Sequence, residues 1–155
     1  MGYRLSRNLE ASLIDYFRAA LITDSWVGVQ CEKSLKQSEI KLPCILIYCS
    51  NTDTQKKEIG SGEYIKYPNI VIRIYGTNEG NREDLADWVL EKLEGTINYY
   101  TYTNGGETKS QVAGGISIIK IIRDTKELSS TDPEAIEFRD RYRHVLEVSC
   151  LVGEI

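Results

Sequence analysis

The chain contains a strongly apolar run, Leu42–Cys49, that passes directly into a long polar stretch, Ser50–Gly62. The run LPCILIYC is the most apolar in the sequence, and Pro43 suits the entry of a strand, so it predicts a buried strand. The polar stretch has a single large apolar residue, Ile59, and two glycines near its end that favour a turn. Because long inserts in compact domains usually mark a functional surface or disorder, we interpret this stretch as a hairpin arm that meets other chains.

Two amphipathic helices are predicted on either side of the central strands. In residues 5–22, leucine or phenylalanine recurs every four positions, which places an apolar stripe on one helix face. In that helix Arg7, Glu10, Asp15 and Arg18 are expected on the other sides. The second helix is predicted over residues 81–94, with Asn81 as its N-cap, acidic residues in its first turn and a glycine just after its end.

The remaining strands are predicted from β-branched and aromatic residues that alternate with other types. They fall at Trp26–Gln30, Asn69–Tyr75, Ile97–Thr103, Ile116–Ile122 and Tyr142–Val152. The polar segments Cys31–Lys41 and 123–135 are expected to be loops. Long crossovers are few, so we expect one α+β domain over residues 1–155: a two-layer sandwich with a mixed, mostly antiparallel sheet and both helices on one face.

The composition of the chain limits the classes of function that we expect. At 155 residues the chain can bury a real core, and 41% apolar with 27% charged residues is ordinary for a soluble globular domain. The net charge of -4 and the lack of a basic block argue against a groove for tight nucleic-acid binding. The opening MGYRLSRNLE has no apolar core of a signal peptide, and no apolar run is long enough to suggest a membrane span.

The cysteines predict no disulfide or metal site. Cys31, Cys44, Cys49 and Cys150 include no C-x-x-C pair, and strand alternation places Cys44 and Cys49 on opposite faces. We therefore expect reduced core thiols in a cytosolic protein.

Catalytic patterns are sparse. The one histidine, His144, lies within a predicted strand, and we expect no cofactor, metal or catalytic residue. One alternative is a metal-dependent nuclease of the restriction-enzyme type, in which Asp24 and Glu39 would hold Mg²⁺ and Lys41 would orient the attacking water. Asp24 also fits as a residue that ends a helix. The charged run from 137 to 143 could contact nucleic acid or a protein partner.

The order of these elements resembles a known family. An amphipathic helix precedes the LPCILIY strand, and a polar hairpin leads to the strand NIVIRIYG. The helix NREDLADWVLEKLEG follows, and the chain closes on RYRHVLEVSCLV. This arrangement resembles the tail terminator, or tail completion, proteins of tailed bacteriophages, over nearly the whole chain.

The resemblance implies a structural virion protein and not an enzyme. Members of that family are small α/β subunits that form a ring, usually a hexamer, at the head-proximal end of the tail tube. The implied partners are other copies of the chain, the tail tube protein and the head connector, with genomic DNA passing through the lumen without specific binding. The implied location is the virion neck, after assembly in the host cytoplasm; the other alternative is a small cytosolic adaptor domain.

Assembly of this kind needs surfaces for neighbouring subunits and for the tube. We expect them on the Ser50–Gly62 arm, on a second hairpin over Tyr99–Val112 and on the arginine-rich start of the last strand. The candidate interface residues are Lys56, Lys57, Glu58, Ile59, Glu63, Tyr100, Tyr102, Arg139, Arg141 and Arg143.

Overall fold

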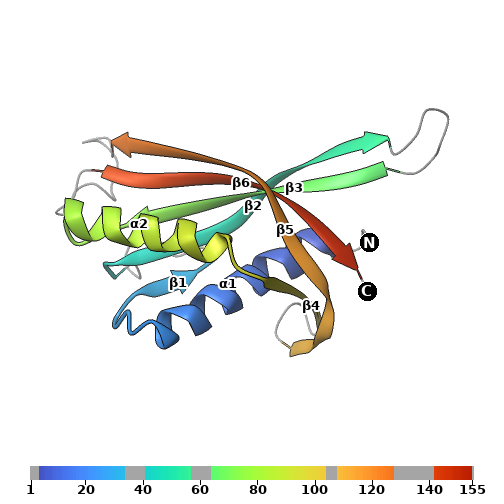
Figure 1. The fold of residues 1–155 in the computed structure, drawn as a ribbon, viewed down its shortest axis with the longest axis horizontal. Helices are drawn as coiled ribbons and strands as arrows, with labels where there is room; N and C mark the ends of the chain where they lie inside the picture. Colours follow the sequence, from blue (N-terminus) through green and yellow to red (C-terminus); the bar gives the residue numbers. More distant parts are fainter. Residues whose placement is uncertain (1–3, 34–40, 57–63, 104–107, 128–141, 155) are drawn as a thin grey trace.

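A computed structural model describes the chain except for residues 1–3, 34–40, 57–63, 104–107, 128–141 and 155 (Figure 1). The elements, in chain order, are α1 (Leu5–Thr23), β1 (Gln30–Glu32), β2 (Cys44–Lys56), β3 (Tyr64–Tyr75), α2 (Glu79–Leu93), β4 (Ile97–Thr103), β5 (Thr108–Glu127) and β6 (Tyr142–Glu154). The strands form one sheet in the order β1-β2-β3-β6-β5-β4. β1 and β2 are parallel and the other pairs are antiparallel, so the predicted α+β class and mixed, mostly antiparallel sheet are confirmed.

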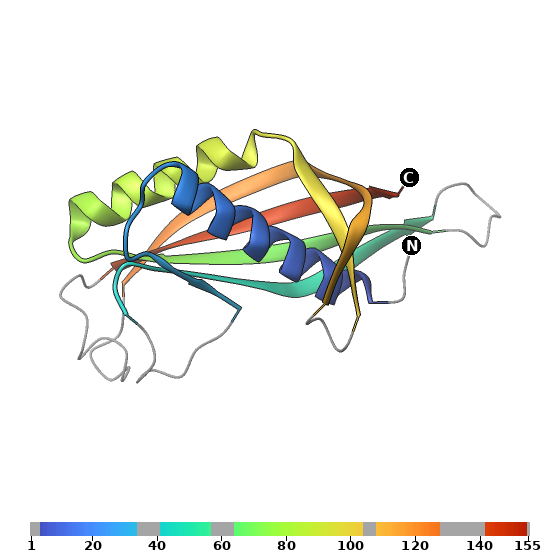
Figure 2. The same ribbon diagram turned by 90° about the horizontal axis from the view of Figure 1, so that it is seen from below.

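The sheet is curled into a half-barrel around α1. The long strand β5 pairs with β4 near its start and with β6 over the rest of its length, and Figure 1 shows it bending between the two. α1 contacts β4 at one end of the sheet and β1 and β2 at the other. In Figure 2 both helices lie on the same side of the sheet.

One hydrophobic core joins the helices to the concave face of the sheet. Leu9, Phe17, Ile45, Ile72 and Leu146 are among its fully buried side chains, and α2 adds residues from its own apolar face. Alternate residues of β6, from His144 to Val152, are buried, as the alternation in the sequence predicts. Removal of this apolar surface from water is the main free-energy term that favours the fold.

Polar residues of α1 also satisfy backbone groups at the edges of the sheet. Ser12 Oγ accepts a hydrogen bond from Tyr100 N at 2.9 Å, and Arg7 donates to Tyr102 O at 2.7 Å. At the other edge, Arg18 Nε donates to Cys31 O at 2.9 Å. Because an unpaired strand edge invites other strands, α1 protects β4 and β1 from pairing with another chain.

Two predicted boundaries are wrong. The strand expected at Trp26–Gln30 lies instead at Gln30–Glu32, because Trp26 N donates to Leu21 O and closes the turn that ends α1. α2 begins at Glu79, and its N-cap is Asn78, whose side chain accepts from Asn81 N at 2.9 Å. Asn81 serves the same helix start by accepting from Thr77 N at 3.0 Å.

Four strands extend past their predicted bounds: β2, β3, β5 and, by two residues, β6. The β2–β3 ladder continues to Lys56↔Tyr64, and the segment 123–127, expected to be a loop, belongs to β5 because it pairs with β6. Pro68 lies within β3, opposite Thr52, one residue before the predicted start of that strand at Asn69. Pairing of β3 with β6 runs from Ile74↔His144 only as far as Asn69↔Ser149. Pro68 lies just outside it, so the missing N–H of Pro68 leaves no gap in that ladder.

Candidate functional site

Among the residues that the structure describes, few cover the outer edge of β2. β1 covers only Cys44–Leu46. Past that point Cys49 N donates to a side chain of α1, and Ser50 is an extra residue in a bulge that shifts the alternation by one. The backbone groups of Thr52 and Thr54 therefore point outward, away from β3, and no hydrogen bond to them is found from any residue that the structure describes.

The side chain that receives Cys49 N is Glu10, which we expected outside the apolar stripe of the first helix. Glu10 is nevertheless buried and only 6% exposed. Its carboxylate accepts from Cys49 N at 2.8 Å and pairs with Lys33 Nζ at 2.8 Å. The β2 bulge frees a backbone N–H, and a buried carboxylate is retained only where such donors surround it.

The sheet divides at the end of the β3–β6 pairing. β2 has its bulge at Ser50, and β5 has one between Ile118 and Lys120, at the same level of the sheet. Beyond this level, the outer hairpin, which we define as Asn51–Lys56 with Tyr64–Asn69, diverges from β6 (Figure 1).

Asn69 links the two sides of the division. Its Nδ2 donates to Asn51 Oδ1 at 2.7 Å and to Asp53 Oδ2 at 3.0 Å, both on β2. Its Oδ1 accepts from Ser149 Oγ of β6 at 2.7 Å, and its backbone oxygen accepts from Ser50 Oγ at 3.2 Å. One amide side chain thus joins the outer hairpin to the central strand.

A groove lies along this division on the face of the sheet opposite the helices. It consists of two adjoining hollows of about 250 and 300 Å³ that share Lys120 and Ser149. The outer hairpin supplies Asp53 and Tyr67, while β5 supplies Ile119 and Ile122. We call it the outer-face groove.

A second exposed surface is apolar. Ile22, in the last turn of α1, is 82% exposed, and Val27, in the turn that follows α1, is 92% exposed. These are the largest exposures among large apolar side chains in the described residues. Together with Leu21, Trp26 and Val29 they border a hollow of about 480 Å³. Apolar side chains this exposed on an ordered turn are typical of contact surfaces.

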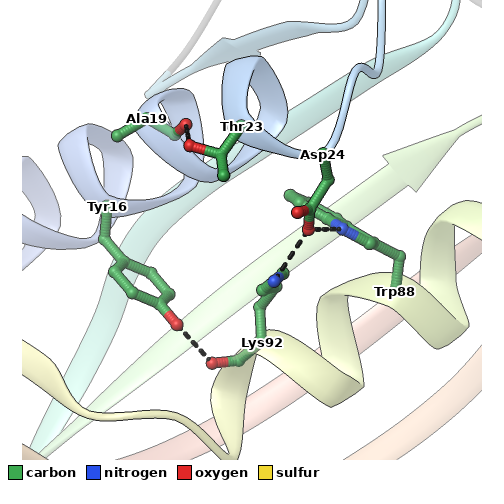
Figure 3. Close-up of polar contacts among 6 residues, drawn as sticks. All are labelled: Tyr16, Ala19, Thr23, Asp24, Trp88 and Lys92. Atoms are coloured by element: carbon green, nitrogen blue, oxygen red, sulfur yellow. Dashed lines mark hydrogen bonds and ion pairs between the residues drawn. The ribbon is translucent and has the colours of Figure 1, made fainter.

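A polar cluster joins α1 to α2 (Figure 3). Asp24 Oδ2 accepts from Lys92 Nζ at 2.7 Å and from Trp88 Nε1 at 2.8 Å, and Tyr16 donates to Lys92 O at 2.7 Å. The Lys92 hydrogen bond, followed by that of Trp88, holds the pKa of Asp24 below its usual range, and the pKa of Lys92 is raised by the same bond. Asp24 therefore has a helix-linking role.

This role does not favour the nuclease alternative. The Asp24 carboxylate faces an ammonium and an indole N–H, Lys41 is exposed, and Glu39 lies outside the described residues. Across the part of the chain that the structure describes, no three His, Cys, Asp or Glu side chains gather as a metal site would require.

Tyr102, one of the predicted interface residues, is buried within the subunit. It is 4% exposed, and its hydroxyl donates to Asp15 Oδ2 at 2.6 Å, so it packs within the subunit. Burial and the Asp15 hydrogen bond raise the pKa of the Tyr102 phenol. Tyr100 is half-buried and carries Lys109 Nζ 3.8 Å from its ring centre, beside a hollow of about 410 Å³ between α1 and β4.

Of the other predicted interface residues, the structure describes two, Lys56 and Arg143. Lys56 ends β2, and Arg143, half-buried, donates to the Tyr75 hydroxyl at 3.4 Å. The remaining six lie outside the described residues: Lys57, Glu58, Ile59, Glu63, Arg139 and Arg141.

The four cysteines are free thiols, and Cys44 and Cys49 lie on opposite faces of β2 as predicted. Cys31 and Cys150 are buried, and loss of solvation raises the pKa of each to about 12. Thiols of this kind are poor nucleophiles and poor metal ligands at neutral pH.

No protein-family model matches this chain, and a search of curated proteins gave no match. Neither α1 nor α2, the helices of the described part, combines the length and the hydropathy that a membrane span requires.

Proposed function

We propose that this protein is a structural subunit that assembles with copies of itself into a ring. The proposed ring is the one that caps the tail tube in the neck of a phage. In this proposal the ring, hexameric by resemblance, ends growth of the tail tube and joins it to the head connector. Genomic DNA passes through its lumen, and the net charge of -4 suits a conduit to which DNA does not adhere. The outer hairpin, as part of the arm inferred from the sequence, reaches a neighbouring subunit or the tube.

The open edge of β2 is the observation that carries the proposal. The chain protects its β4 and β1 edges with α1 side chains, yet it leaves the groups of Thr52 and Thr54 free of described partners. An exposed strand edge of this length is a template for a strand from another chain. The exposed Ile22 and Val27 add a second contact surface.

Replacing Thr54 with proline tests the proposal. Thr54→Pro removes an N–H that points to the open edge and not to β3, so the hairpin should still form. Thr54→Val keeps the N–H and the strand preference and serves as the matched control. Light scattering and electron microscopy should show rings for the wild type and Thr54→Val, and mainly monomers for Thr54→Pro.

A second experiment uses purified tail tubes, because the subunit could form its ring only on the end of a tube. The wild type and Thr54→Val should bind tube ends, and Thr54→Pro should not. A wild-type protein that stays monomeric at high concentration and also ignores tubes would contradict the proposal. Metal-dependent DNA cleavage that is lost in Asp24→Asn would support the nuclease instead.

A further inference from the structure

The outer-face groove is lined by charged side chains and by exposed apolar side chains that the pairing of its strands does not require. Lys120, on β5, is exposed and makes no ion pair or hydrogen bond with any described residue. Asp53 and Glu147 are exposed acidic residues on its borders. Ile119 and Ile122 are 56% and 43% exposed, and Ile119 is the extra residue of the β5 bulge. Bulges often re-aim a side chain for contact, and here one turns an isoleucine toward solvent.

We propose that the outer-face groove is the docking site for the arm of a second copy of this chain, with Lys120 paired to Glu58 of that copy. This inference rests on the proposed function and identifies the surface that receives the arm. The arm sequence Lys56-Lys57-Glu58-Ile59 offers two cations, one anion and one apolar side chain in succession. The groove offers the complementary set: two carboxylates, one ammonium and exposed isoleucines.

Charge complementarity of this kind selects the partner and the register of a contact. A lysine-rich arm would be repelled by a basic groove, and an isolated Glu58 would be repelled by Asp53 and Glu147 without Lys120. The pairing also joins two different surfaces, the arm and the groove. Such a head-to-tail contact produces a closed ring when the rotation between subunits closes, whereas a contact of like surfaces produces a two-fold dimer.

Charge reversal tests the pairing. Lys120→Glu and Glu58→Lys should each weaken self-association by roughly tenfold or more, and the double variant should recover most of the loss. Lys126→Glu is the matched control, because Lys126 lies on the same strand and the same face and is also exposed. Association is measured by analytical ultracentrifugation, and unchanged melting temperatures check that each variant folds.

A synthetic peptide of residues 54–65 separates this inference from the proposed function. Titrated into the protein, it should bind the wild type and Lys126→Glu and should bind Lys120→Glu at least several-fold more weakly. Equal binding to all three, or no binding, would overturn the inference whether or not the protein forms rings. If Thr54→Pro abolishes assembly while Lys120→Glu assembles like the wild type, the groove inference fails and the proposed function stands.

Discussion

Ser25 adopts a backbone conformation that usually belongs to glycine. Its φ is +59°, and it follows α1 at the position where Ser25 N donates to Ile22 O at 3.2 Å and Trp26 N donates to Leu21 O at 2.9 Å. These two bonds close the helix end in a Schellman arrangement, in which the left-handed residue is commonly glycine. With Gly28 at φ +79°, the turn presents Val27 to solvent in a fixed way.

Replacing Ser25 with glycine should stabilise the protein. Glycine removes the strain of the left-handed conformation, about 1–2 kcal/mol. It also raises the conformational entropy of the unfolded chain, which offsets part of that gain, so we expect the free energy of unfolding to rise by about 0.5–1 kcal/mol. Urea denaturation measures it. Gly28→Ala, where the space is open but φ is positive, should change the stability in the opposite direction. A loss of stability in Ser25→Gly would show that the serine side chain has another role.

The Asp24 carboxylate should make stability depend on pH. Because its pKa is lowered in the folded protein, first by Lys92 and then by Trp88, its contribution is present above the unfolded pKa of about 3.9. It is lost as the pH falls through the lower folded pKa. Asp24→Asn should therefore melt at a lower temperature than the wild type at pH 7, and the difference should close in strong acid.

Thermal melts from pH 2 to pH 8 measure this effect. Asp87→Asn is the control, because Asp87 forms an exposed ion pair with Arg123 at 2.6 Å and such pairs contribute little. An Asp24→Asn variant whose melting temperature differs from the wild type by the same amount at every pH would contradict an electrostatic role.

At the scale of elements, α1 does more than fill the half-barrel. Its apolar stripe packs in the core, while Ser12, Arg7 and Arg18 bind the outer strands and Glu10 binds the β2 bulge. One helix thus determines which strand edges are closed. The edge that it does not cover is the outer part of β2, and the division of the sheet at Asn69 sets that part apart from β6.

Asn69→Ala should loosen the outer hairpin. The substitution removes hydrogen bonds to Asn51, Asp53 and Ser149, and we expect a loss of about 1–2 kcal/mol in unfolding free energy. Hydrogen exchange should rise more in residues 64–68 than in the rest of the sheet. Asn98→Ala, on an exposed position of β4, should change neither quantity by much. Uniform exchange across the sheet would show that Asn69 does not act locally.

At the scale of the whole molecule, one core serves all the described elements. Buried residues from both helices and from β1 to β6 belong to the same cluster, and Cys31 and Cys150 lie in it at different strands. The surfaces proposed for assembly are all outside this core, on the open β2 edge, the outer-face groove and the turn with Val27. Contact with another subunit can therefore form without disturbing the fold.

The buried thiols should report the opening of this core. Cys49 is half-buried and should react first with a thiol reagent at pH 8, whereas Cys31 and Cys150 should react only on unfolding. Because burial raises their pKa values, the unfolded thiols ionise first, and stability should fall as the pH rises from about 8.5 toward 12. Mass spectrometry of alkylated peptides measures the order; labelling of Cys150 as fast as Cys49 would contradict a single core.

The sequence by itself determined the helices, the alternation in the strands and the α+β class, because these follow from local apolar periodicity. The tertiary structure alone decided where polar residues go. Glu10 and Tyr102 are buried since partners distant in sequence satisfy them, Pro68 fits a strand since β6 has already departed, and β5 extends since β6 pairs with it. The open β2 edge is of the same kind: whether a strand has a neighbour depends on the path of the whole chain, which no local pattern encodes.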